Sequence, residues 1–151
     1  MRAVYDANVV VAGVCWQGEG WLCLIKLAQR QAFAFGTAAT LAETRETAIR
    51  LIDQQAPAHN AAGRLTWYLD TVRIVDPIPL GKARSRAPKD DPYLAAALAA
   101  KAEAIVTYDR DLLVLEKPFG IRIVRPIEFL RLLQPFPSTG LARSDLNLRT
   151  P

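Results

Sequence analysis

Four acidic residues stand where a hydrophobic strand pattern ends or a helical pattern begins. Asp6 directly follows the first strand pattern of the chain, and Asp109 comes just after a β-branched strand pattern that ends at Thr107. Asp91 stands at the start of an Ala-rich helical pattern, and Glu43 lies close to the first turn of another helix. In a parallel sheet, the carboxyl ends of strands and the amino ends of the helices share one edge. We therefore expect these four acids to converge there.

Clustered carboxylates have a chemical use that scattered ones lack. They repel one another and raise one another's pKa values unless a cation neutralises them. Because the set contains oxygen ligands and no His or Cys, it suits a hard ion, Mg²⁺ or Mn²⁺. Such a site places one or two divalent ions against a phosphate, activates a water as the nucleophile and stabilises the leaving oxygen.

Each acid taken alone also has a structural interpretation. Asp91 is a good helix cap, Glu43 fits a solvated helix face, and Asp109 could simply begin a turn. Asp6 is the hardest to explain in this way, because folding seldom needs an acid at the end of a hydrophobic strand. Nucleophilic Ser or Cys chemistry has little support, since the serines lack triad-like partners and the lone His59 falls on the weakest helical pattern.

The elements that must position these acids alternate along the chain. Strand patterns are expected at residues 3–5, 32–35, 71–75, 104–107 and 121–124, and helical patterns at 20–31, 38–55, 56–70, 91–102 and 126–133, with a short helix or turn at 109–116. The small residues after Asp6 indicate a turn at the strand tip. Strands separated by helices favour an α/β fold with a mainly parallel sheet.

Composition sets the outer limits of the interpretation. At 151 residues the chain fits one domain, with 51% hydrophobic and 23% charged residues. Its net charge of +4 permits a polyanionic partner without demanding one. Cys15 and Cys23 form neither a disulfide framework nor a zinc pattern, so we expect two reduced, buried thiols. Neither a targeting signal nor a membrane-spanning run of roughly 18 apolar residues is evident, and we expect a cytoplasmic protein with no membrane partner.

The stretches "VYDANVVVAG", "TLAETRET" and "KDDPYLAAALAAKAEAIVTYDRDLL" resemble the PIN-domain family, in particular its VapC-like members, the toxins of bacterial and archaeal toxin–antitoxin pairs. The resemblance ends near Leu133 and covers most of the chain. It implies a three-layer α/β/α sandwich and a Mg²⁺- or Mn²⁺-dependent ribonuclease. The family's acidic quartet, both catalytic and metal-binding, falls on Asp6, Glu43, Asp91 and Asp109.

The same resemblance implies supporting positions around the quartet. Asn8 matches a small polar residue two positions after the first acid, and Thr107 matches a threonine that orders the site. Asp111 and Asp90 are neighbouring acids that could assist, with Asp111 the better candidate. Two departures concern Ala87, which occupies a place that is often acidic, and Tyr108, which stands where glycine is frequent.

The resemblance and the composition together give the domain organisation. A PIN-like nuclease domain is expected at residues 1–133, followed by a flexible tail at 134–151 that loses periodicity and gains Pro and Gly. A basic loop adjoins the third acid and is made of Lys82, Arg84, Arg86 and Lys89. It is either solvated loop charge or a grip on the phosphates that flank a scissile bond.

The function we expect is that of an endoribonuclease toxin, with RNA and an antitoxin protein as partners. A homodimer is a possible further assembly. One alternative is a phosphoryl-transfer domain of receiver or phosphatase type. The phosphatases of that kind need Asp-x-Asp directly after the first strand, where this chain has "DAN". A second alternative is a non-catalytic module that binds RNA or docks an antitoxin. Metal-dependent cleavage of RNA separates it from the enzyme.

Overall fold

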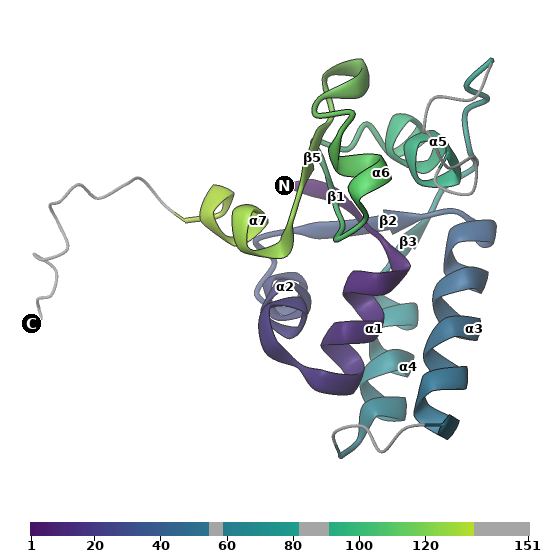
Figure 1. Cartoon of the computed structure of the whole chain (residues 1–151), viewed down its shortest axis with the longest axis vertical. Helices are drawn as coiled ribbons and strands as arrows, with labels where there is room; N and C mark the ends of the chain where they lie inside the picture. Colours follow the sequence, from purple (N-terminus) through teal and green to yellow (C-terminus); the bar gives the residue numbers. More distant parts are fainter. Residues whose placement is uncertain (55–58, 82–90, 135–151) are drawn as a thin grey trace, which may run out of the picture.

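The computed structural model describes residues 1–54, 59–81 and 91–134, and it alternates strands with helices along the chain (Figure 1). In order, the elements are β1 (Arg2–Tyr5), α1 (Ala7–Trp16), α2 (Gly18–Ala28), β2 (Phe33–Gly36), α3 (Ala38–Gln54), α4 (Ala61–Thr71), β3 (Arg73–Ile74), α5 (Asp91–Ala100), β4 (Ala104–Val106), α6 (Arg110–Leu113), the 3-10 turn η2 (Pro118–Gly120), β5 (Arg122–Val124) and α7 (Pro126–Leu132).

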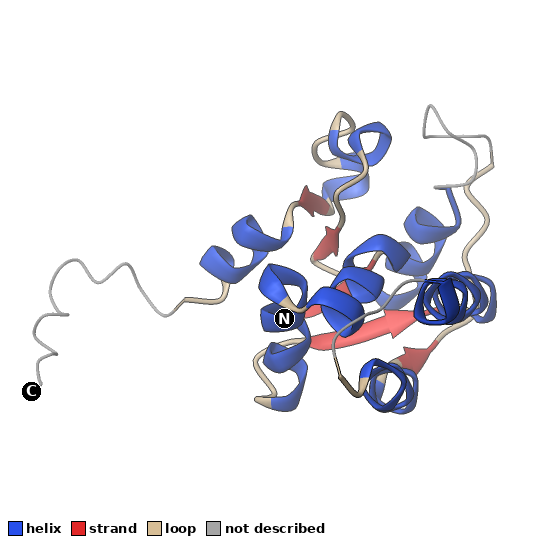
Figure 2. Ribbon diagram, turned by 60° about the horizontal axis from the view of Figure 1, so that its bottom comes forward, coloured by secondary structure: helices blue, strands red, loops and turns tan. Residues whose placement is uncertain are grey.

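The strands form one five-stranded sheet in the order β3-β2-β1-β4-β5. Every pairing is parallel, with Ala3 opposite both Ala34 and Ala104. Helices cover both faces, with α5 and α6 on one side and α1 to α4 on the other (Figures 1 and 2). The predicted three-layer α/β/α sandwich with a parallel sheet is therefore confirmed. Because every strand runs the same way, all carboxyl ends lie at one edge.

The two central strands are almost entirely buried. β4 has no exposed residue, and Ala3 to Tyr5 of β1 are each at most 2% exposed. Continuous apolar runs of this kind are typical of parallel strands covered on both faces. A polar residue that directly follows such a strand is held in place by the core beneath it.

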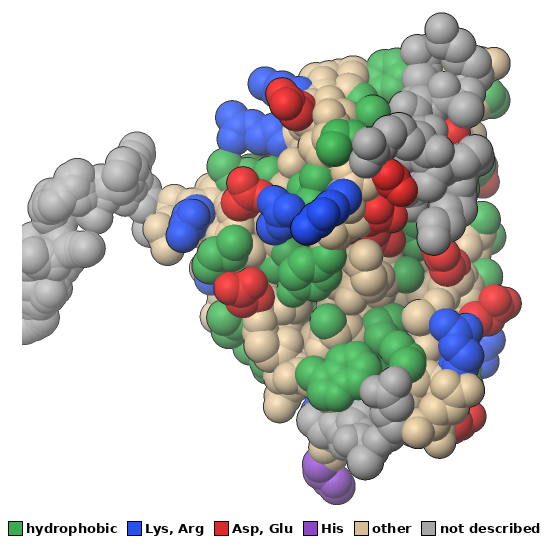
Figure 3. All heavy atoms as spheres, viewed as in Figure 1, with side chains coloured by type: hydrophobic (Ala, Val, Ile, Leu, Met, Phe, Trp, Pro, Cys, Tyr) green, Lys and Arg blue, Asp and Glu red, His purple; other side chains and the backbone are tan. Residues whose placement is uncertain are grey.

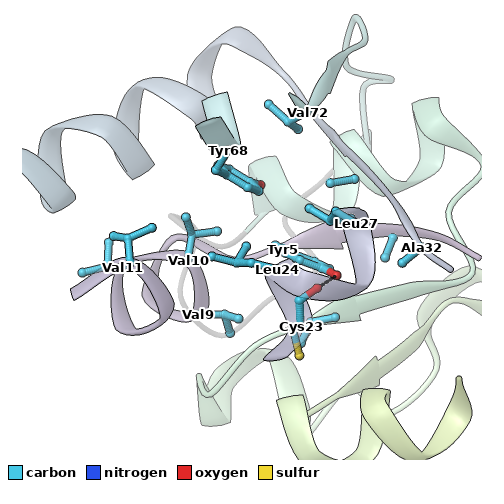
Figure 4. Packing of buried hydrophobic residues seen from close by; sticks show 14 of the residues in the cluster. Tyr5, Val9, Val10, Val11, Cys23, Leu24, Leu27, Ala32, Tyr68 and Val72 are labelled. Carbon is cyan, nitrogen blue, oxygen red and sulfur yellow. Dashed lines mark hydrogen bonds between the residues drawn. The ribbon is translucent and has the colours of Figure 1, made fainter. Parts of the chain in front are cut away.

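The segment after Asp6 is helix α1, and our expectation of a turn there was wrong. Its run Val9–Val11 is β-branched, which disfavours a helix in isolation. Seven of its ten residues are buried, so tertiary packing overrides that preference. Figure 4 shows this packing, in which the hydroxyl of Tyr5 donates to the carbonyl oxygen of Cys23 on α2 at 2.7 Å.

His59 and the two cysteines lie in different surroundings, the first in a turn and the others in the core. The histidine expected on a helix, His59, lies in the turn before α4, where its carbonyl oxygen accepts from Nη1 of Arg64 at 2.6 Å. Cys15 and Cys23 are free and buried, as expected. No single helix in the described part of the chain is long and apolar enough to span a membrane, and α1 and α2, which pass that test only as a pair, bend by 99°.

Candidate functional site at the carboxyl edge of the sheet

Asp6 lies at the centre of the carboxyl edge. Its backbone N–H donates to the carbonyl oxygen of Val106 at 2.9 Å, which ties it to β4, and its own carbonyl accepts from Val9 of α1 at 3.0 Å. The residue is only 5% exposed. Asp6 is thus fixed between two buried elements, with a carboxylate placed in surroundings that disfavour a charge.

Thr107 joins Asp6 to the segment that carries Asp109. Its fully buried hydroxyl donates to Oδ2 of Asp6 at 2.6 Å and accepts from the backbone N–H of Asp109 at 2.9 Å. One side chain therefore sets the orientation of the first carboxylate and the path of the backbone toward another. The structure brings all three residues together. The sheet edge led us to expect Asp6 and Asp109 there, and the family resemblance implied Thr107.

Asp109 is the N-cap of the short helix α6. Its Oδ1 accepts from the backbone N–H of Asp111 at 2.8 Å. Both residues are half-buried. One oxygen of Asp109 therefore holds the turn, so the expectation that Asp109 begins a turn is compatible with a role at the site.

Glu43 reaches this edge from α3 and is held by a partner that the sequence patterns did not single out. The hydroxyl of Tyr93, on α5, donates to Oε1 of Glu43. Tyr93 is 2% exposed, whereas Glu43 is exposed. In the sequence Tyr93 reads as part of the apolar face of α5. Nothing in the local sequence signals its contact with Glu43, which arises where α3 packs against α5.

The electrostatics of the site centre on Asp6. Burial, and to a smaller extent the negative charges of Glu43 and Asp109, raise the pKa of its carboxyl to about 6, against the lowering effect of the hydrogen bonds from Thr107 and the Ala7 backbone. The pKa of Tyr93 is also raised, first by burial, then by the charge of Asp6 and by its bond to Glu43. The edge therefore carries surplus negative charge that a cation would relieve.

The remaining predicted site residues lie on α1, on α5 and outside the described residues. Asp91 is the first residue of α5 and half-buried, and Asn8 is exposed in the first turn of α1. Asp90 and the basic loop residues Lys82, Arg84, Arg86 and Lys89 lie outside the described residues, as does all but the first residue of the expected tail. Their assigned roles stay predictions.

The donor chemistry of the site fits a hard divalent cation, because its ligands are carboxylate oxygens around a carboxyl of raised pKa. Across residues 1–54, 59–81 and 91–134, no three His, Cys, Asp or Glu side chains are close enough to hold an ion as they stand. Binding would therefore have to bring the carboxylates closer to one another. Figure 3 shows Asp and Glu side chains gathered near the centre of this face.

Comparison with known proteins agrees with the fold. A model of the PIN domain matches residues 2–111. The crystal structure of PAE2754 from Pyrobaculum aerophilum is similar with a TM-score of 0.58 and 19% sequence identity, over 87% of this chain and 89% of that chain. At that identity the likeness concerns the fold alone. The sequence matches none of the curated proteins.

Proposed function

The chain belongs to the PIN-domain family, and from that premise we propose that it is a Mg²⁺- or Mn²⁺-dependent endoribonuclease. PIN domains are generally nucleases, which are hydrolases of phosphodiester bonds. The observation that carries the proposal is the chain of contacts from Asp6 through Thr107 to Asp109 at the carboxyl edge of a parallel sheet. It holds buried negative charge at the place where such sheets bind ligands.

The residues that would hold the cation are Asp6, Glu43 and Asp109, with Asp91 from the start of α5. When bound, such a cation lowers the pKa of water and neutralises charge on a phosphate. Thr107 keeps the Asp6 carboxylate in one orientation, and the hydroxyl of Tyr93 does the same for Glu43. The protein thereby orients its oxygen ligands in advance, and a small movement of the carboxylates toward one another would complete the site.

The biological role we propose is that of a toxin inhibited by a co-expressed antitoxin protein. RNA would be its substrate in the cytoplasm, and a homodimer is a further state to test. The basic loop 82–89 would hold flanking phosphates of the RNA, because the acids alone would repel a polyanion.

The test is cleavage of single-stranded RNA by the purified full chain. We expect products with Mg²⁺ or Mn²⁺, none in excess EDTA, and none from Asp6→Asn with metal present. Equal cleavage in EDTA would exclude the metal mechanism. RNA binding without cleavage under any metal would instead favour the non-catalytic module.

A further inference from the structure

Tyr108 departs from the family pattern and stands between two residues of the site. It follows Thr107 and precedes Asp109, and its side chain is 40% exposed although its neighbour Thr107 is fully buried. Arg110, the next residue but one, is also exposed. Thr107, Asp109 and Asp111 are thus buried or half-buried, whereas the two residues between them are exposed.

Arg125 joins this exposed pair from the neighbouring strand. β4 and β5 are in parallel register with Val106 opposite Val124, and the N–H of Thr107 donates to the carbonyl oxygen of Val124 at 2.9 Å. Arg125 directly follows Val124 and is exposed. The register therefore places Arg125 beside the Thr107–Tyr108 segment, at the same edge as the carboxylates.

Tyr108 lies near α2. Partial burial raises the pKa of its hydroxyl, and the next contributions come from Glu19 and Cys23 of α2. The thiol of Cys23 in turn donates to the carbonyl oxygen of Pro126, the first residue of α7, at 3.7 Å. The exposed side chain of Tyr108 is thus near α2, and the strand register places Arg125 beside its backbone. Glu19 is the acidic side chain of α2 that acts on its hydroxyl.

We infer that Tyr108, Arg110 and Arg125 form a stacking surface for single-stranded RNA beside the carboxylates. An unpaired base stacks on the ring of Tyr108, and the guanidinium groups of Arg110 and Arg125 hold the phosphates on either side of it. In Figure 3, Lys and Arg side chains between α6 and α7 lie beside the group of acidic side chains. The inference rests on the proposed function and names how that site receives its substrate.

The chemistry of the three side chains matches such a ligand. Aromatic side chains bind unpaired bases without regard to sequence, because every base has a π-face, and arginines supply the phosphate contacts. Paired bases are not free to stack in this way. The surface should therefore prefer an unpaired strand to a duplex of the same sequence.

The experiment uses the full chain carrying Asp6→Asn, so that the RNA is not cleaved, with Mg²⁺ present. Fluorescence anisotropy with a labelled single-stranded oligoribonucleotide measures Kd over a range of salt concentrations. Adding Tyr108→Ala should weaken binding about ten-fold, whereas Tyr108→Phe should retain it. Adding Arg125→Ala should lower the salt slope by about 0.7. Arg122→Ala, at the opposite end of β5, is the matched control and should change neither quantity.

Two results would overturn the inference. One is that Tyr108→Ala and Arg125→Ala bind as tightly as the Arg122→Ala control. The other is that a duplex binds as well as the single strand. Metal-dependent cleavage by the chain without substitutions is measured separately. If it is present while either result holds, the stacking surface is wrong and the proposed function stands. If cleavage is absent and either result holds, both fall. If cleavage is absent and neither result holds, the stacking surface stands and the proposed enzyme activity falls.

Discussion

Asp6 combines two properties that a residue selected for folding alone would not have. It is buried, and the charges of two other carboxylates act on it. An ionised carboxylate in that position destabilises the metal-free fold, and the hydrogen bond from Thr107 offsets only part of that cost. A bound cation would remove the remainder, so stability and function are coupled at this residue.

The Asp6 carboxyl gives a pH dependence whose sign follows from its raised pKa. Its ordinary value is 3.8, and its value in the folded protein is about 6. Below pH 4 it is protonated in both states. Between the ordinary pKa of 3.8 and the folded-state pKa of about 6, the Asp6 carboxyl keeps a proton in the folded protein that it has lost in the unfolded chain. The contribution of this carboxyl to stability therefore falls as the pH rises and is fully lost above pH 6. The difference is about 3 kcal/mol.

We therefore expect Asp6→Asn to be more stable than the parent protein at pH 8 in EDTA, with the difference shrinking toward pH 4. Urea unfolding followed by circular dichroism across this range measures it. A stability difference between Asp6→Asn and the parent protein that does not change with pH would show that the surroundings do not raise the pKa of the Asp6 carboxyl.

Tyr93 should act through Glu43 without entering the reaction. Tyr93→Phe removes one hydroxyl from a buried ring and leaves the exposed Glu43 carboxylate free to reorient. We expect Mn²⁺ affinity to fall about ten-fold, as for other residues that orient a metal ligand, with stability changed by about 1 kcal/mol or less. Isothermal titration with Mn²⁺ measures the first, and thermal unfolding in EDTA the second.

The matched control for Tyr93→Phe is Tyr5→Phe. It also deletes a buried hydroxyl, one that bonds to the Cys23 carbonyl oxygen on α2 and not to a carboxylate. It should lower stability with no change in Mn²⁺ affinity. Equal affinities for the two variants would show that the bond to Glu43 is structural only.

The sequence predicted the acid that follows a buried strand, Asp6, but it did not predict the tyrosine that bonds to a site carboxylate, Tyr93. Asp6 stands out in the sequence because it directly follows a run of apolar residues, whereas only the family resemblance indicated Thr107. Tyr93 does not stand out, since a tyrosine on an Ala-rich helix is more often a core residue. Only the packing of α3 against α5 reveals that its hydroxyl meets Glu43.

Among the elements, α1 and α2 determine how the helix behind Asp6 is held. They approach so closely at Gly13 and Gly20 that a Cβ on Gly20 would lie 2.8 Å from the carbonyl oxygen of Val9. A backbone atom cannot move aside as a flexible side chain can. The two glycines therefore allow the contact that fixes α1, whose first turn carries Asp6 as its N-cap.

Gly20→Ala should accordingly destabilise the protein by about 1–3 kcal/mol, because the added methyl group forces the two helices apart. Chemical denaturation measures the loss. The comparison is Gly63→Ala in α4, where the three atoms nearest the new Cβ belong to the Asn60 side chain, the closest at 2.3 Å. That side chain can rotate away, as the backbone of Val9 cannot, and the helix gains propensity. If both substitutions had the same small effect, the close approach of α1 and α2 would not limit stability.

The sequence identified all five strands to within two residues at each end, because their apolar runs are bounded by polar residues and turns. It missed α1 for a physical reason. Three consecutive valines favour a strand locally, and only burial against α2, α3 and α4 makes the helix the better state. Local patterns cannot show which distant segments will cover a helix.

At the scale of the whole molecule, acids are concentrated within a chain of net charge +4. The parallel topology brings the ends of β1 and β4 and the start of α5 to one edge, which local sequence could predict once the sheet was recognised as parallel. The side-chain geometry could not be predicted in the same way. Which partner holds each carboxylate, as Tyr93 holds Glu43, depends on how α3 packs against α5.

The binding of a divalent cation by the carboxylates around Asp6 can be seen in a crystal of the full chain soaked in Mn²⁺, through anomalous density measured near the manganese absorption edge. We expect a peak within bonding distance of Asp6 and Asp109, with Glu43 or Asp91 turned toward it, and no such peak in Asp6→Asn. A well-ordered carboxyl edge without a peak at saturating Mn²⁺, or the same peak in Asp6→Asn, would contradict it.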